Sequence, residues 1–152
     1  MLYKISMADL GDVDEITQSG GRFISASPSS EFVSYHEEGF GHMLISLVQQ
    51  GVLKIWVCRQ DKELVGYIGL LVAPNIYNPT ETLGDIYFVD VFEEHRKNGI
   101  ATELIKTVEK YAKNNSITSL SISFNDFDIA KHIVDKMNYT PTEYKLMKRI
   151  KE

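Results

Sequence analysis

The stretch Gly84–Thr107, GDIYFVDVFEEHRKNGIATELIKT, carries the pattern that decides the fold. Its first part, Asp85–Val91, is rich in β-branched and aromatic residues, which favours a strand. The polar residues 93–98 cannot continue a buried strand, and they lead to Gly99. From Ile100 the apolar residues return every three or four positions, as on one face of an amphipathic helix. The stretch therefore predicts a strand, a tight loop and a helix.

The junction between the loop and the helix is suited to bind phosphate. The first backbone N–H groups of a helix have no partner within it and lie at the positive end of the helix dipole. Gly99 and Ala101 leave the main chain open to a diphosphate, and Arg96 and Lys97 add positive charge at the rim. The motif Arg-x-x-Gly-x-Ala is common enough to arise by chance, so its position between a strand and a helix carries the argument.

With the residues around it, this motif resembles the acyl-CoA-binding motif of the GNAT superfamily of N-acetyltransferases, Gln/Arg-x-x-Gly-x-Gly/Ala after a strand that ends in Val. It lacks the Gly-Lys-Ser/Thr of the nucleotide P-loop and the three glycines of the dinucleotide fingerprint. The resemblance covers the chain well from Val52 onward and earlier residues only by element order. It implies an α/β (α+β) fold with a mixed, mostly antiparallel twisted sheet. A central, splayed pair of parallel strands is expected in that sheet, with helices on either side.

The resemblance implies acetyl-CoA as the cofactor. In the family the pantetheine arm lies where the two parallel strands splay, so Val89 and Val91 would offer main-chain groups to it. The N–H of Val89 would also polarise the thioester carbonyl. Asn125, after the next strand, is expected to hydrogen-bond the cofactor. The residues expected around the diphosphate are Arg96, Lys97, Asn98, Gly99, Ile100, Ala101 and Thr102.

Acetyl transfer to an amine needs a base, because a typical amine is protonated at neutral pH. Asp85 is the first candidate, since it lies eleven residues before Arg96, where histone-type members of the family carry a glutamate. Alternation along the strand would put Asp85 on one face with Tyr87, Val89 and Val91. Tyr87 and Glu81 are the reserves, and the alternative for Asp85 is a plain exposed carboxylate at a strand start.

One departure from the family keeps other functions open. The family often protonates the departing thiolate with a tyrosine of the penultimate helix, and Val134 stands at that place here. Water or another group then serves, or the thiolate leaves unprotonated. The rival function is a non-catalytic acyl-CoA-binding regulatory module. A third, nucleic-acid binding through the basic residues between 145 and 151, is opposed by a net charge of -5.

The remaining patterns predict one further helix pair, a hairpin and a closing strand. Gly20-Gly21 is expected to end the first helix, a break is expected in the second near Gly39 and Gly41, and Trp56 on the hairpin is expected in the core. The expected elements are a strand over 2–6, helices over 8–19 and from about 31 to 50, hairpin strands over 52–59 and 63–73, a long loop over 74–83, a strand over 118–124, a helix over 127–137 and a last strand over 143–150.

Length and composition favour one soluble domain. The 152 residues suffice for one core, so a single N-acetyltransferase domain over 1–152 is expected. The first residues, MLYKIS, do not form a signal peptide, and no apolar stretch reaches membrane-spanning length. Cys58 is the one cysteine, and it is expected to be a small buried hydrophobe in a reducing compartment. These features predict a cytoplasmic protein that does not bind membranes.

The partners follow from charge and from the resemblance. The acidic chain favours a cationic primary amine as the acceptor, borne by a small molecule or by a protein. The four histidines show no spacing typical of a metal site, so no metal is expected. A homodimer through edge strands is compatible with the sequence, which does not decide it. The carboxylates expected to form an acidic approach for the acceptor are Glu31, Glu37, Glu38, Glu81 and Asp85.

Overall fold

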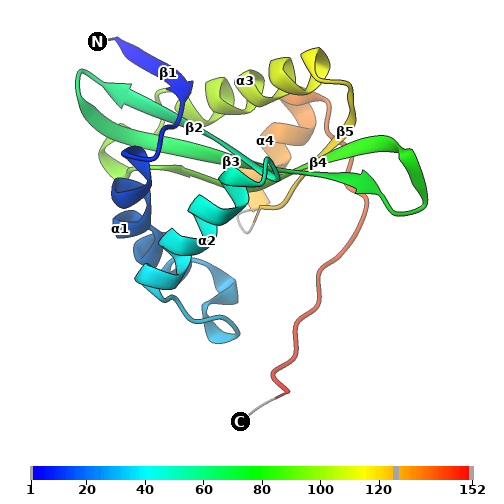
Figure 1. Ribbon diagram of the computed structural model, residues 1–152, viewed down its shortest axis with the longest axis horizontal. Helices are drawn as coiled ribbons and strands as arrows, with labels where there is room; N and C mark the ends of the chain where they lie inside the picture. The colour runs from blue at the N-terminus through cyan, green and yellow to red at the C-terminus, as the bar shows by residue number, and fades with distance from the viewer. Residues whose placement is uncertain (1, 125–126, 151–152) are drawn as a thin grey trace.

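The computed structural model describes residues 2–124 and 127–150, and Figure 1 shows the arrangement of its elements. Most of the expected elements are present, within a few residues of their expected bounds. In chain order they are β1 Tyr3–Met7, α1 Asp12–Ser25, the 3₁₀ helix η1 Pro28–Glu31, α2 Glu37–Gln49, β2 Leu53–Gln60, β3 Glu63–Asn75, β4 Asn78–Val91, the 3₁₀ helix η2 Glu93–His95, α3 Ile100–Asn114, β5 Ile117–Ile122 and α4 Phe127–Met137.

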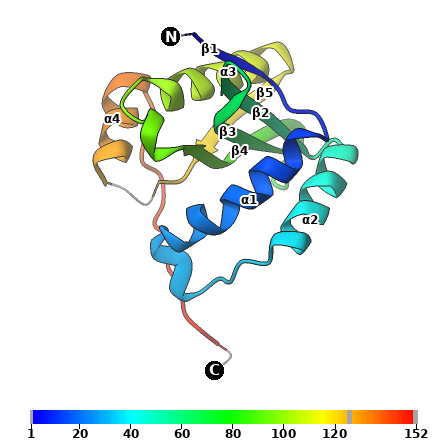
Figure 2. The same ribbon diagram turned by 90° about the vertical axis from the view of Figure 1, so that its left-hand side faces the viewer.

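The strands form one sheet in the order β1-β2-β3-β4-β5. Neighbours are antiparallel from β1 to β4, and β4 pairs with β5 in parallel, with α3 as the connection. Helices α1 and α2 cover one face of the sheet, whereas α3 and α4 cover the other (Figure 2). The mixed, mostly antiparallel α/β fold that the sequence predicted is therefore confirmed.

Each face of the sheet has its own apolar core. Trp56 is 5% exposed, and its ring packs edge-on against Tyr111 of α3, with 5.1 Å between the ring centres. Trp56 is thus a core residue, as expected. Cys58, also expected to be buried, is fully so. On the opposite face, Tyr67 and Phe88 pack beneath α1 and α2.

The expectation that Gly20-Gly21 ends the first helix was wrong, because α1 continues to Ser25. A Cβ atom at Gly20 would lie 2.7 Å from the hydroxyl oxygen of Tyr35, so the glycine makes room for that ring. The expected break in the second helix near Gly39 and Gly41 was also wrong, because α2 is continuous, and it starts at Glu37 rather than near residue 31. There the ring of His36 caps the start of α2 by accepting a hydrogen bond of 2.9 Å from the Gly39 N–H.

The expected loop over 74–83 is also wrong, because β3 and β4 continue through most of it as an arm that extends beyond the sheet (Figure 1). The turn between them is short. The Asn75 side chain accepts a hydrogen bond of 3.0 Å from the Tyr77 N–H, and this local bond closes the turn. The tip residues Ile76 and Tyr77 are 86% and 94% exposed.

The closing strand expected over 143–150 is absent from the described residues, so that prediction was wrong. Tyr144 and Leu146 alternate as in a strand but are 97% and 92% exposed. After Asn138, whose φ is 61°, the chain runs away from the sheet (Figure 1), and the Arg149 guanidinium donates to the Glu31 carbonyl. Alternation alone does not form a strand without a partner edge. As a result, the parallel pair lies at one edge of the described sheet rather than at its centre.

Among the described residues, no helix combines the length and apolar character needed to cross a membrane.

Candidate functional site

A bulge in β4 is the feature on which the site is built. Ile86 lies opposite Leu70 and Phe88 lies opposite Gly69, so Tyr87 is an extra residue in β4 without a partner in β3. The parallel pairing of β4 with β5 ends at the same level, at the pair Ile86–Ile122. β5 ends at Ile122, so β4 runs on past Ile86 without β5 beside it, and the bulge bends β4 at this level. The point at Tyr87 where β4 runs on past the end of β5 is where the resemblance implies the splay, and it is called the splay below.

Beyond the bulge, two residues of β4 present main-chain groups on the open side. The Phe92 N–H donates to the Val65 carbonyl of β3 over 2.9 Å. Since hydrogen bonding alternates along an antiparallel strand, the main-chain groups of Asp90 also face β3, whereas those of Val89 and Val91 face away from it. The Val91 carbonyl indeed accepts a hydrogen bond of 2.9 Å from Arg96 Nε. In the part of the chain that the structure describes, no strand pairs with β4 on that side beyond Ile86.

The bulge also changes which side chains share a face. Ile86 and Val89 both pack in the core beneath α3, whereas Phe88 packs in the core beneath α1 and α2. Asp85 precedes Ile86 without interruption, so its side chain lies on the α1–α2 face. The expectation that Asp85 shares a face with Val89 was therefore wrong, because simple alternation does not hold across an extra residue.

Asp85 is half-buried and its orientation is fixed by a neighbour in β5. The Ser121 hydroxyl donates a hydrogen bond of 2.8 Å to Asp85 Oδ1, across the parallel pair. Tyr87, at the bulge, is 68% exposed. Glu81 lies further back along β4, where its carboxylate accepts a hydrogen bond of 3.1 Å from Asn75 Nδ2. Asp85 and Tyr87 thus lie at the splay, whereas Glu81 belongs to the arm.

The loop after β4 is held in shape by its own polar groups. The Asn98 side-chain amide donates to the carbonyls of His95 and Arg96, at 3.0 and 3.2 Å. Lys97 and Gly99 have φ values of 63° and 77°, in the left-handed region that turns the chain sharply into α3. Holding Lys97 in this region takes local support, which the Asn98 bonds supply.

The start of α3 is open. No side chain of the described residues caps this end of the helix, and a Cβ atom built at Gly99 would meet nothing within 4 Å. The N–H groups of Ile100, Ala101 and Thr102 belong to the helix start, where unpaired N–H groups attract an anion. The geometry therefore suits a diphosphate next to the open side of β4.

Two positions singled out from the sequence add no group to the described site. Asn125 lies outside the described residues. Val134 is half-buried on α4 and offers no proton donor where the family often has a tyrosine.

Asp90 is a residue of this region that the sequence reasoning missed. It is 7% exposed, and its Oδ2 atom has no hydrogen-bond partner among the described residues. Burial raises the pKa of the Asp90 carboxyl, against the opposing effects of Arg22, Arg96 and a hydrogen bond with Tyr67. A carboxylate inside the apolar run Ile86–Val91 was the signal that could have revealed it.

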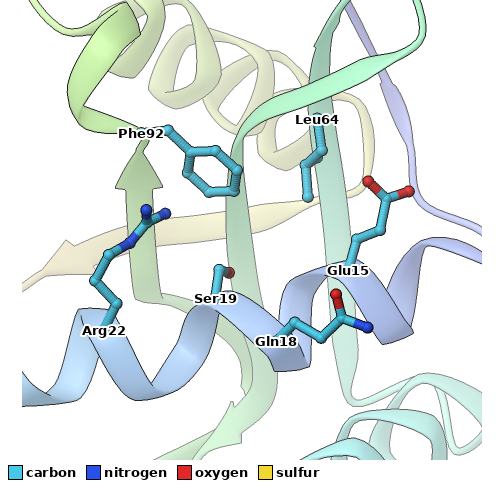
Figure 3. Close-up of a pocket in the computed structure, with 6 residues that line it drawn as sticks. All are labelled: Glu15, Gln18, Ser19, Arg22, Leu64 and Phe92. Carbon is cyan, nitrogen blue, oxygen red and sulfur yellow. The ribbon is translucent and has the colours of Figure 1, made fainter.

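Two cavities lie on the α1–α2 side of the sheet. The first, of about 290 Å³, lies between α1 and the strands (Figure 3), where the Arg22 guanidinium stacks over Phe92 with its Cζ 4.6 Å from the ring centre. The second, of about 370 Å³, lies between α1 and α2. Its lining includes the carboxylates of Asp14, Glu37 and Glu38, so this groove favours a cation.

Comparison with known proteins agrees with this geometry. The model of the acetyltransferase (GNAT) family matches residues 23–136, and the chain therefore belongs to the GNAT family of acetyltransferases. No curated protein sequence matches the chain.

Solved structures share the fold at low sequence identity. A ribosomal-protein-alanine N-acetyltransferase from Brucella melitensis biovar Abortus 2308 is 17% identical, with a TM-score of 0.76 over 99% of this chain and 100% of that one. A predicted acetyltransferase from Clostridium acetobutylicum, solved with acetyl-CoA, is 15% identical, with a TM-score of 0.76 over 98% and 97%. Glucosamine-6-phosphate N-acetyltransferase from Arabidopsis thaliana is 12% identical, with a TM-score of 0.74 over 99% and 100%. At these identities the likeness concerns the fold.

Proposed function

We propose that this protein is an acetyl-CoA-dependent N-acetyltransferase that transfers the acetyl group directly to a primary amine, without a covalent enzyme intermediate. The observation that carries the proposal is the splay of β4 from β5 at Tyr87, next to the open start of α3. In a member of the GNAT family, the open side of β4 suits a thioester and the start of α3 suits a diphosphate, so one acyl-CoA molecule could occupy both.

The chain's own groups have distinct tasks in binding the cofactor. The N–H groups from Gly99 to Thr102, with the charge of Lys97, receive the diphosphate. The outward main-chain groups of Val89 and the Val91 N–H hydrogen-bond the pantetheine amides as a neighbouring strand would, whereas the Val91 carbonyl already accepts from Arg96. The Val89 N–H then donates to the thioester oxygen and stabilises the negative charge that develops on it during attack.

Asp85 is the proposed base. It lies on the α1–α2 face at the splay, and Ser121 holds one of its oxygens at 2.8 Å, which leaves the other oxygen for the acceptor or a bridging water. The cationic amine first gives one proton to Asp85, which passes it to water. The neutral nitrogen then forms a bond with the acetyl carbon, the carbon–sulfur bond breaks, and Asp85 receives the second proton that the nitrogen loses. The thiolate needs no donor from the chain for this balance, since a thiol with a pKa near that of cysteine, about 8.5, gives a fair leaving group.

The proposed acceptor is a cationic primary amine. The groove lined by Asp14, Glu37 and Glu38 attracts a cation on the same face of the sheet as Asp85. The names of the structural neighbours include both a protein acceptor and an aminosugar phosphate, so both kinds of amine belong in the test.

The test is a thiol-release assay with acetyl-CoA and a panel of amines that includes polyamines, aminosugars and peptides. We expect turnover with at least one amine, and a fall in kcat/KM of about 100-fold or more in Asp85→Asn, because a positioned base contributes about 10²–10⁴-fold. Asp61→Asn, in the turn between β2 and β3, removes the same charge far along the chain from the site and is the control. An unchanged rate in Asp85→Asn would exclude this base.

A non-catalytic acyl-CoA-binding module is the second candidate, and Val134 in place of a proton donor is the feature that favours it. One pair of measurements, CoA binding and thiol release, distinguishes this binding module from the enzyme. Calorimetric binding of CoA, without thiol release for any amine in the panel, would select the binding module.

A further inference from the structure

Asp90 is a buried carboxylate that the proposed reaction does not use. It lies in β4 between Val89 and Val91, the two residues whose main-chain groups face the open side. Its own side chain is 7% exposed, and Oδ2 has no hydrogen-bond partner among the residues that the structure describes. Buried polar atoms of native proteins are nearly always paired, so an unpaired carboxylate oxygen calls for an explanation.

The charge of Asp90 is costly for folding. The raised pKa means that the folded protein favours the protonated carboxyl more than the unfolded chain does. Protonated Asp90 therefore adds to the free energy of unfolding, and this contribution is complete at a pH below the ordinary pKa of an aspartate. It is lost as the pH rises through the raised pKa of Asp90. At neutral pH a neutral side chain of the same shape would therefore stabilise the fold. A group that costs stability and stays partly unpaired is a candidate for a functional role.

The surroundings of Asp90 connect three parts of the protein. Tyr67 lies directly opposite it in β3, its hydroxyl bonds to the carboxylate, and Ser19 Oγ of α1 lies 3.1 Å from that hydroxyl. Arg22, one turn further along α1, points toward the end of β4 and stacks over Phe92 (Figure 3). Both Arg22 and Arg96 attract Asp90 electrostatically.

Arg96 is the link to the cofactor loop. It is the first residue of the motif Arg-x-x-Gly-x-Ala, and its Nε donates to the Val91 carbonyl over 2.9 Å. This bond ties the loop to the open side of β4 at Val91, two positions after Val89. Arg96 is exposed, so water competes with the Val91 carbonyl for its guanidinium group. A negative charge near Arg96 favours the bond to the carbonyl.

We propose that Asp90 is a positioning residue of the cofactor site, whose carboxylate keeps Arg96 on the Val91 carbonyl and thereby fixes the diphosphate loop relative to β4. This inference rests on the proposed function, because it takes the loop to be the diphosphate site. A cationic acceptor is not the partner of Asp90, since two guanidinium groups already act on this carboxylate and repel a further cation.

The experiment compares Asp90→Asn with the wild type in calorimetric titration with CoA and in denaturant unfolding. Asparagine keeps the shape and removes the charge. We expect a higher unfolding midpoint together with CoA binding weakened about tenfold, within the usual range of coupling between two sites. Asp61→Asn is the control for loss of one negative charge, and it should leave CoA binding unchanged.

A double-mutant cycle tests whether Asp90 acts through Arg96. In an Arg96→Ala background, Asp90→Asn should cost no further CoA affinity, because the group that it positions is gone. Full additivity of the two losses would overturn the proposal. The pH profile is a second readout: the wild type should lose CoA affinity relative to Asp90→Asn as the pH falls through the raised pKa of Asp90.

A purely structural role for Asp90 predicts a different result in this experiment. A lower midpoint in Asp90→Asn with unchanged CoA affinity would overturn the inference and leave the proposed function intact. If wild-type protein binds no CoA, the proposed function itself fails, and this inference with it. Should Asp90→Asn not fold, Tyr67→Phe removes the hydroxyl that holds the carboxylate, and the same loss of CoA affinity and the same non-additivity with Arg96→Ala are expected.

Discussion

Gly99 is the residue at which the diphosphate proposal can be separated from simple backbone strain. Its φ of 77° disfavours any side chain, although a Cβ atom there would meet nothing within 4 Å. Gly51 has a φ of 73° and equally open surroundings at the end of α2, away from the β4–α3 loop. The two glycines thus form a matched pair that differs in position alone.

Gly99→Ala and Gly51→Ala should each lower the free energy of unfolding by about 1–2 kcal/mol, the usual cost of a left-handed residue with a Cβ atom. Only Gly99→Ala should also weaken CoA binding, because its methyl group stands where a phosphate would approach the helix start. Chemical denaturation and calorimetry measure the two effects. Equal CoA affinity in both variants would count against the open helix start as the diphosphate site.

At the scale of elements, the contact between α1 and Tyr35 holds the helix pair together. The Tyr35 hydroxyl donates to the Thr17 carbonyl of α1, and its ring leaves no room for a Cβ atom at Gly20. In α2, a Cβ atom at Gly41 would meet only a methyl carbon of Thr17, at 3.3 Å. Both glycines lie inside helices, where alanine gains about 1 kcal/mol over glycine.

Gly20→Ala should lower the free energy of unfolding relative to Gly41→Ala by about 1–3 kcal/mol, the usual cost of overpacking a core. The helix-propensity gain is common to both variants, so their difference isolates the contacts of Gly20 with Tyr35 and with Phe40, whose ring lies 3.0 Å from the added Cβ atom. Urea denaturation of the two proteins measures it. Equal stabilities would mean that Tyr35 does not constrain the helix pair.

Periodicity and polar interruptions predicted most of these elements, and close contacts explain where they failed. The change at Ile100 to apolar residues every three or four positions located α3, because neighbouring residues in the sequence determine where a helix starts. Gly20 instead serves a contact with Tyr35, fifteen positions away in the chain, which no local pattern reveals. The turn at Asn75 was missed for a related reason, since a side-chain bond closes it within an arm that otherwise reads as a loop.

For the candidate site, the sequence predicted the loop but not the geometry of the strand before it. Arg96, Gly99 and their spacing are readable as a motif. The extra residue at Tyr87 is not, because a bulge depends on the pairing of β4 with β3, and it places Asp85 on the opposite face from Val89. Asp90 was overlooked because a carboxylate inside a strand is usually assigned to the exposed face, and its burial beneath α1 is a tertiary effect.

At the scale of the whole molecule, the two faces of the sheet divide the proposed work. In the proposed reaction, α3 on one face of the sheet (Figure 2) receives the diphosphate at its N-terminal end. The other face, beneath α1 and α2, carries Asp85 and the acidic groove. The splay of β4 from β5 joins the two faces at one opening. The proposal thus has the two substrates meet from opposite sides of the sheet, an arrangement suited to direct transfer.

The structure of the protein with CoA bound tests this account most directly. We expect the diphosphate within hydrogen-bond distance of the N–H groups from Gly99 to Thr102, and the pantetheine arm beside Val89 and Val91 in the space where β4 leaves β5. A CoA molecule bound elsewhere, with the start of α3 unoccupied, would contradict the account.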